Sequence, residues 1–308
     1  MKQPTSISKE NYPNGYVLTT DSNCDLTAAL LDEYRIPCIS MPYSLDGEVF
    51  RRDPSIDFDP ATFYHAMREG KPAKTMSCNV EEFKQFWRPY LEAGLDVVYL
   101  GFTHRLSGTF DNACMARDAL KEAFPDRRIV CDDTLLICVP QGLFLLLCGK
   151  KYQSGATMDE LLAFAAENRQ HIATQVAVDT LEYLRRGGRI SSATATFGTL
   201  LDIKPLLHIS PEGALEVIGK CKGRKKALRR VVEMTMANYD PRMGDDDMMI
   251  AFGSDDDEAV TRIEEMLRQE GVRCPILRLS IGPVIGAHIG PGAAGVTYIG
   301  KQRTIEEK

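Results

Sequence analysis

The chain has 308 residues, of which 44% are hydrophobic and 26% charged, a composition typical of globular proteins and unlike that of disordered or collagen-like chains. Its 37 Lys and Arg and 43 Asp and Glu give a net charge of −6, which excludes a global basic field that would attract nucleic acid or an anionic membrane. The length favours two domains over one.

In the first half of the chain, apolar strands alternate with amphipathic helices. We predict strands at residues 15–20, 36–40, 96–101 and 128–131, and a hairpin at 45–50 around Asp46-Gly47. We predict helices at 60–68, 80–92, 107–124 and 158–169, and one that begins after an Asp25 cap and carries Leu26 to Tyr34. This alternation is typical of a three-layer α/β unit with a parallel sheet, which we assign to residues 1–172.

Residues 134–148 form an apolar segment that Pro140, Gln141 and Gly142 interrupt. The segment is shorter than the roughly 20 residues that a membrane-spanning helix needs, so we expect no stable membrane insertion. A helix without a polar face is usually buried within a protein. We therefore predict a core helix at 135–147 that also forms part of the wall of an apolar pocket in the first domain.

The second half, residues 173–308, has the pattern of another α/β domain. Strands at 203–209 and 214–219 are predicted to form a hairpin around Pro211-Glu212-Gly213. Further strands are predicted at 175–178, 248–252, 276–280 and 296–299, and helices at 181–186, 225–238 and 258–270. A cleft between two such domains is a favoured place for a ligand.

The nine cysteines and the N-terminal segment favour a reducing, cytoplasmic location. The cysteine count is odd and no pair has C-x-x-C spacing, so the sequence indicates neither a disulfide framework nor a zinc site. Residues 1–16 are polar and lack the apolar stretch of a secretory signal. We therefore expect a cytoplasmic protein without structural metal.

Two hydroxyl-bearing segments follow predicted strands and precede predicted helices. Leu106-Ser-Gly-Thr109 lies at the carboxyl end of strand 96–101, where ligands bind in open α/β sheets. Ser107 and the Gly108 amide would donate to an anion at the positive end of the helix, although from these residues alone a plain N-cap is the more common role of such a serine. Thr75 precedes the helix at 80–92 in the same way.

A glycine-rich segment follows His288. Gly290-Pro-Gly-Ala-Ala-Gly295 matches the G-x-G-x-x-G pattern, but only 13 residues remain after it, too few for the rest of a dinucleotide-binding unit. We predict a tight glycine turn at a domain edge. The imidazole of His288 beside these backbone amides could donate to a carboxylate or phosphate, with a purely structural role as the alternative.

The sequence indicates binding rather than turnover. It has no G-x-S-x-G, no H-E-x-x-H and no P-loop, and a hydrolase that used Ser107 would lack an evident base. Residues 220–230 carry seven Lys and Arg without interleaved aromatic residues. We interpret this run as a solvated helix face or a docking surface for an anion or a protein, not as a nucleic-acid groove.

Several blocks together resemble the DegV family, in family order from residue 16 to about 300. They are Thr20-Asp21-Ser22 with Asp25-Leu26, Lys74-Thr75, Leu106–Thr109, Val178–Ser191, Ile203-Lys-Pro205 and Ile281–Gly292. The resemblance implies a two-domain fold. Its N-terminal domain would be a three-layer α/β/α unit with a parallel sheet, and its C-terminal domain an α/β unit with a mixed sheet.

The resemblance also implies a function. DegV proteins bind one long-chain fatty acid in an apolar tunnel, and those of the FakB type present its carboxylate to a partner fatty acid kinase for phospholipid synthesis. Such a protein is a carrier without catalytic activity, and its ligand is the fatty acid rather than a cofactor. The alternative is a small-carbonyl or other anion-binding protein of dihydroxyacetone-kinase-like architecture.

The family motifs also assign residues to this function. The carboxylate would be held by Thr75, Ser107, the Gly108 amide and His288. Contacts with phosphate or with the kinase would come from Arg189, Arg224, Lys225 and Lys226. The chain departs from the family pattern at Met76–Asn79, at Thr103-His104 and at Ile289. These departures leave the acyl-chain preference open.

Overall fold

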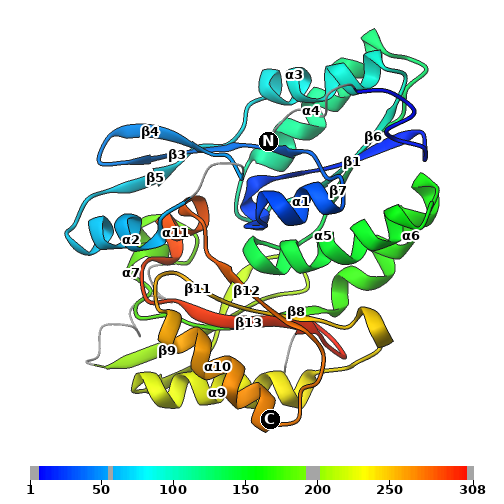
Figure 1. Cartoon of the computed structure of the whole chain (residues 1–308). Coiled ribbons are helices and arrows are strands. Elements are labelled where there is room, and N and C mark those ends of the chain that lie inside the picture. Colours follow the sequence, from blue (N-terminus) through cyan, green and yellow to red (C-terminus); the bar gives the residue numbers. More distant parts are fainter. Residues whose placement is uncertain (1–6, 55–57, 192–201, 304–308) are drawn as a thin grey trace.

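The computed structural model describes residues 7–54, 58–191 and 202–303. Figure 1 shows the N-terminal half at the top and the C-terminal half below it, with a layer of helices between their sheets. Within the described residues, no helix has both the length and the apolar character needed to cross a bilayer.

The first half alternates strands and helices as predicted. Its strands are β1 (Tyr16–Asp21), β2 (Cys38–Ile39), β3 (Met41–Leu45), β4 (Glu48–Arg52), β5 (Ala73–Thr75), β6 (Asp96–Gly101) and β7 (Ile129–Asp133). Its helices are α1 (Ala28–Glu33), α2 (Pro60–Arg68), α3 (Val80–Glu92), α4 (Thr109–Ala123), α5 (Cys138–Gln153) and α6 (Met158–Asn168), with short 3₁₀ helices η1 (Ser22–Cys24) and η2 (Arg169–His171).

The second half contributes one larger sheet and its covering helices. The strands are β8 (Ile172–Ala177), β9 (Ile203–Ile209), β10 (Leu215–Lys222), β11 (Met249–Gly253), β12 (Ile276–Ser280) and β13 (Ala294–Ile299). The helices are α7 (Glu182–Arg186), α9 (Arg224–Asn238), α10 (Asp257–Gln269) and α11 (Pro283–Ile289), with the 3₁₀ helix η4 (Gly244–Asp246).

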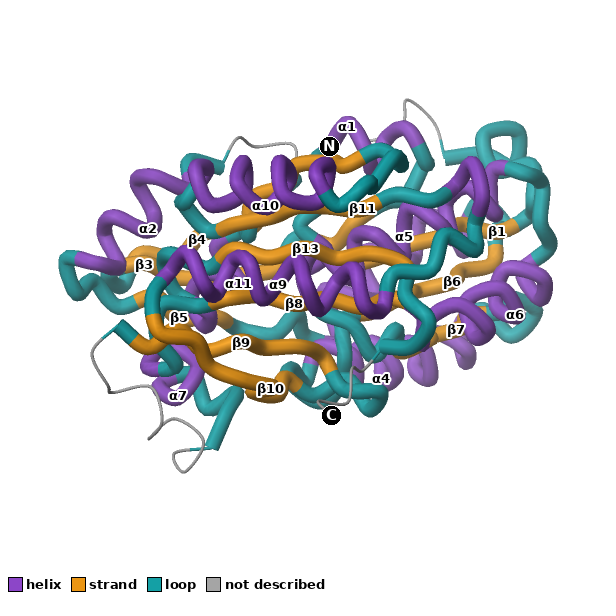
Figure 2. Tube along the Cα trace, turned by 90° about the horizontal axis from the view of Figure 1, so that it is seen from below, coloured by secondary structure: helices purple, strands orange, loops and turns teal. Residues whose placement is uncertain are grey.

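The two main sheets confirm the predicted fold class. The first has strand order β2-β1-β6-β7 and is parallel throughout. The second, in the order β10-β9-β8-β13-β11-β12, is mixed, because only β11 and β12 pair in parallel. Figure 2 shows α9 and α10 across the outer face of this second sheet. A small antiparallel sheet has the order β4-β3-β5 and belongs to the N-terminal half (Figure 1).

Helix α5 packs between the two main sheets. It contacts β8, β11 and β13 of the second sheet as well as η1 and α6 of the first half. Residues 138–149 of this helix are buried on every side, including the polar Gln141, whose Nε2 donates to Thr20 Oγ1 at 3.2 Å. Gly142 allows this close packing, because a Cβ there would lie 2.6 Å from the carbonyl oxygen of Cys24. The prediction of a buried core helix is confirmed.

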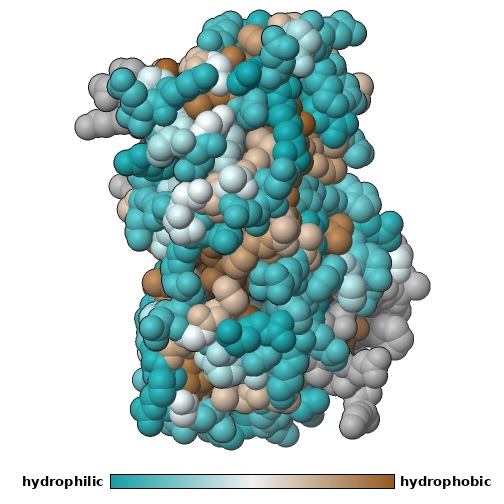
Figure 3. Space-filling model, turned by 90° about the vertical axis from the view of Figure 1, so that its right-hand side faces the viewer, coloured by the Kyte–Doolittle hydropathy of each residue, from teal (hydrophilic) through white to brown (hydrophobic). Residues whose placement is uncertain are grey.

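One cluster of buried apolar residues therefore spans both sheets. It joins Leu18 and Val98 of the first sheet to Val176 and Leu207 of the second through the leucines of α5. On the face seen in Figure 3, apolar residues reach the surface mainly near mid-height, where the two halves meet. The chain passes from the first sheet to the second at β8. Because the two halves share this cluster, the division into two domains at residue 172 stays a prediction.

Two details differ from the sequence predictions. The cap of α1 is Thr27, whose side chain accepts from the Leu30 amide, and not Asp25. Asp25 is buried with a φ of 53°, where it accepts from Cys138 Sγ at 3.0 Å. The core helix begins at Cys138 rather than at residue 135, because Ile137 before it is extended, with a φ of −137° and a ψ of 160°.

Helix α11 is an element that the sequence analysis missed, as is strand β5. It starts after Gly282 with Pro283 at its first position and ends at Gly290, which has a φ of 80°. It packs against β3, β5, α2 and α7. This packing brings His288, in its last turn, next to Thr75 at the end of β5.

Candidate functional site

An apolar pocket of about 100 Å³ lies between the two halves of the molecule. The first half lines it from η1, the segment after β5, the loop after β6 and the start of α5, and the second half from β8, β9, β11 and α11. The prediction that placed the pocket inside the first domain is therefore wrong in position. Most of its lining is apolar: Phe102, Leu106, Ile137, Pro140, Val176, Leu184, Ile209, Leu215, Phe252, Ile281, Val284, Ile285 and Ile289.

Polar side chains gather on this otherwise apolar lining. Thr75, Ser107 and His288, which the sequence analysis selected, all line it. Thr75 Oγ1 lies 2.8 Å from His288 Nε2, a hydrogen bond that joins β5 to α11 across 213 residues of chain. Two of these side chains are therefore in direct contact, and the third lies on the same pocket.

Ser107 belongs to a row of hydroxyl groups. Its Oγ lies 3.0 Å from Thr109 Oγ1 and 3.4 Å from Ser77 Oγ, and it accepts from the Thr109 amide. Gly108 is the N-cap residue of α4, so its amide lies at the positive end of that helix. Ser77 also lines the pocket, and the sequence analysis quoted it without assigning it a role.

Arg189 brings a positive charge to the same pocket. Its Nε donates to the Leu106 carbonyl oxygen at 3.1 Å, and Nη1 donates to the carbonyl oxygen of Gly187. Among the described residues, no carboxylate pairs with this half-buried guanidinium. The sequence analysis grouped Arg189 with the basic run near Arg224, whereas the structure places it beside His288.

His288 is neutral at physiological pH. Burial, together with the nearby charge of Arg189, lowers the pKa of its imidazole to about 4. Its Nδ1 is buried and has no hydrogen-bond partner among the described residues. The backbone of Gly187 covers this nitrogen so closely that a Cβ on Gly187 would lie 2.2 Å from it. A glycine is thus required at residue 187 for His288 to reach Thr75.

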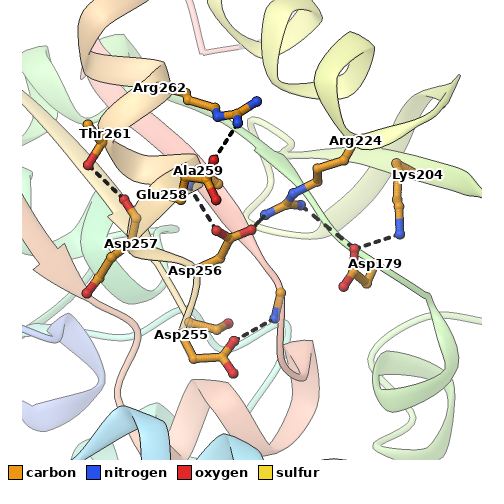
Figure 4. Close-up of polar contacts among 12 residues, drawn as sticks. Asp179, Lys204, Arg224, Asp255, Asp256, Asp257, Glu258, Ala259, Thr261 and Arg262 are labelled. Carbon is orange, nitrogen blue, oxygen red and sulfur yellow. Dashed lines mark hydrogen bonds and ion pairs between the residues drawn. The ribbon is translucent and has the colours of Figure 1, made fainter.

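Arg224 belongs to a network of ion pairs at the ends of strands β8 and β11 of the second sheet (Figure 4). Its Nη2 lies 2.8 Å from Asp256 Oδ2, and its Nη1 lies 3.9 Å from Asp179, which also pairs with Lys204 at 2.8 Å. Lys225 and Lys226, next along α9, are exposed on the outer face of that sheet. A role of these three residues in phosphate or kinase contact stays a prediction.

The departures from the family pattern fall at the site. Met76 and Ile289 line the pocket, so they bear directly on the shape of its wall. Thr103 is buried, while the ring of His104 turns to Asp133, with Nδ1 at 2.5 Å from Oδ2. Within the described residues, no three His, Cys, Asp or Glu side chains gather closely enough to hold a metal ion.

The comparisons with known proteins agree on one family. Residues 16–301 match the model of a family described as uncharacterised proteins of the DegV family. A DegV domain-containing protein of Clostridium perfringens is 32% identical over 286 residues, which cover 92% of this chain and 97% of the relative. One from Streptococcus pyogenes is also 32% identical, with 93% and 98% covered.

Solved structures of the family have the same fold. A fatty acid-binding DegV family protein from Thermus thermophilus is 28% identical, with a TM-score of 0.80 over 92% of this chain and 99% of that one. A DegV lipid-binding protein from Thermotoga maritima is 27% identical, with a TM-score of 0.76 over 94% and 99%.

The contact between Gly187 and His288 can be tested with two alanine variants. Gly187→Ala should lower the free energy of unfolding by about 1–3 kcal/mol, because the added methyl group overlaps the ring of His288. Gly108→Ala is the matched control, since its Cβ would lie 3.9 Å from the nearest atom, Ser77 Oγ. Urea unfolding measures both. Equal midpoints for the two variants would show that residue 187 does not constrain His288.

Proposed function

The chain belongs to the DegV family, and from this premise we propose that it binds one long-chain fatty acid. The acyl chain would occupy the apolar pocket between the two halves, with the carboxylate at the end formed by Thr75, Ser107 and His288. The observation that carries the proposal is that hydroxyl groups, a neutral imidazole and an unpaired guanidinium meet on one apolar pocket.

The acyl chain would supply most of the affinity. Each buried methylene group contributes about 0.8 kcal/mol, so a long chain gains far more than the head group. The pocket encloses about 100 Å³, which is less than the roughly 300–1,000 Å³ typical of small-molecule sites. Side chains along its wall must therefore move apart when a long chain enters.

The head group would be fixed by several donors. If His288 Nε2 carries the ring proton and donates to Thr75 Oγ1, the Thr75 hydroxyl proton is free to donate to a carboxylate. Ser107 and the Gly108 amide would supply further donors at the start of α4, and Arg189 a compensating charge. A buried carboxylate requires such convergent donors, because its desolvation is otherwise costly.

We further propose that the protein is a carrier that presents this carboxylate to a separate fatty acid kinase. The kinase would transfer the γ-phosphoryl group of ATP to a carboxylate oxygen, which yields an acyl phosphate and ADP. The sequence of this chain has no P-loop lysine motif, which supports a separate kinase. Lys225 and Lys226, exposed on α9, are candidate contacts for an acidic kinase surface.

Loss of one donor tests the binding site. Ser107→Ala should weaken fatty acid binding about tenfold to a hundredfold, because a hydrogen bond to a charged group contributes about 1.5–3 kcal/mol. Ser154→Ala, an exposed hydroxyl at the far end of α5, is the control and should bind as the wild type does. Displacement of a fluorescent fatty acid measures both dissociation constants. Equal affinity of wild type and Ser107→Ala would contradict the assignment.

The carrier role makes a separate prediction. The fatty acid-loaded protein should form no acyl phosphate when only ATP is added. Acyl phosphate should form when ATP and a fatty acid kinase are both present. A Lys225→Glu, Lys226→Glu double variant should slow this reaction without altering fatty acid affinity. The control is Lys121→Glu on α4, at the opposite end of the molecule, which should leave the rate of the reaction unchanged. Mass spectrometry detects the product. Acyl phosphate formed without a kinase would refute the carrier role.

A further inference from the structure

Two cysteines meet where helix α4 packs on strand β7, outside the apolar pocket and its polar residues. Cys114 lies in the second turn of α4, and Cys131 is the third residue of β7. Successive side chains of a strand point to opposite faces of the sheet. Val130 packs against the cluster that contains the leucines of α5. Cys131 packs on the other face, against the cluster that includes Ala113 and Ala116 of α4.

Both thiol groups are reachable from solvent. Cys114 and Cys131 are only partly buried, and β7 is an edge strand of the first sheet, so a neighbouring strand covers it on one side only. The described residues include all nine cysteines, and none of these forms a disulfide. The pair is therefore a reduced and accessible dithiol.

A second pair of cysteines provides an internal comparison. Cys24 and Cys38 also lie within hydrogen-bonding range of each other, but both are buried in the core. Burial, together with Cys24 and the nearby charge of Asp21, raises the pKa of the Cys38 thiol well above its ordinary value. The buried pair thus has the same proximity without the access to solvent.

The surroundings of Cys114 favour its thiolate. A thiolate on Cys114 would accept a hydrogen bond from the Cys131 thiol, and Arg117 lies one helical turn further along α4. These two contacts lower the pKa of Cys114 to about 7, although partial burial, Asp111 and Asp118 oppose them. Arg117 Nε also bonds to Asp118 Oδ1 at 2.9 Å, so its charge is shared. About half of Cys114 is therefore thiolate at pH 7, against a few per cent for an ordinary cysteine.

We propose that Cys114 and Cys131 form a reversible disulfide when the protein meets a peroxide. The Cys114 thiolate attacks one oxygen of hydrogen peroxide and breaks the O–O bond, which yields a sulfenic acid and a hydroxide ion. The hydroxide takes up the proton that Cys114 released on ionisation. The Cys131 thiol then attacks the sulfenic sulfur, and its proton leaves with the displaced hydroxide as water. Two thiols and one peroxide thus give one disulfide and two water molecules.

The disulfide is also reducible. A dithiol reductant attacks one of the two sulfur atoms and restores both thiols by exchange, while it becomes a disulfide itself. The link would join α4 to β7, and nothing in this chemistry depends on a bound fatty acid.

Peroxide treatment of the full chain, followed by peptide mapping without reductant, tests the proposal. Mass spectrometry should find the peptides of Cys114 and Cys131 linked to each other. Thiol titration of the unfolded protein should show the loss of two of the nine thiols, which dithiothreitol restores. Cys24 and Cys38 should stay reduced, because they are buried.

Serine variants separate the two roles. Cys114→Ser should lose thiols to peroxide at least about tenfold more slowly than the wild type, because the thiolate is the reactive species. Cys131→Ser should stop at a sulfenic acid on Cys114, which dimedone labels. Cys221→Ser, which removes another half-buried thiol on β10, is the control and should form the link at the rate of the wild type.

Three results would overturn the proposal. The first is a peroxide-treated wild type without a link between the peptides of Cys114 and Cys131. The second is a link between Cys24 and Cys38 that forms sooner. The third is a loss of thiols in Cys114→Ser as fast as in the wild type.

Discussion

The burial of helix α5 on all sides is the constraint on which the rest of the structure depends. With no polar face to present to water, α5 must be covered by both main sheets, and this fuses the two halves into one core. The fused core fixes how the halves meet, and the apolar pocket lies at that junction, next to the first residues of α5. A ligand bound there would touch both halves. Binding should therefore stabilise the whole chain rather than one domain.

The hydrogen bond between Thr75 and His288 organises the polar end of this junction. It joins the small sheet, through β5, to α11, and both elements contribute to the apolar pocket. His288 can serve in this way because burial keeps it uncharged and Gly187 leaves space for its ring. The bond lies at the polar end of an otherwise apolar pocket, an arrangement suited to a ligand with a long chain and an anionic head.

Much of this could be predicted from the sequence, because the signals are local. The alternation of strands and helices indicated the fold class, and the apolar character of residues 134–148 without a polar face indicated a buried helix. The site residues Thr75, Ser107 and His288 were identified from family motifs, and the structure places them on one pocket.

Other features could not be predicted from the sequence. Helix α11 begins with Pro283 and ends at Gly290, as helices often do, but its seven residues are too few to show a periodicity. The positive φ angle of Leu135 has no sequence signal, because leucine rarely adopts this conformation. The position of Arg189 and the placement of the pocket between the halves depend on long-range packing, which no local pattern encodes.

The central claim is that the pocket between the halves holds a fatty acid. It is tested most directly by purifying the protein from a bacterial host, extracting it with organic solvent and identifying the released molecule by mass spectrometry. The account predicts one long-chain fatty acid, or its phosphorylated form, in close to equimolar amount. Release of no lipid, or of a small carbonyl compound or other small anion instead, would contradict it.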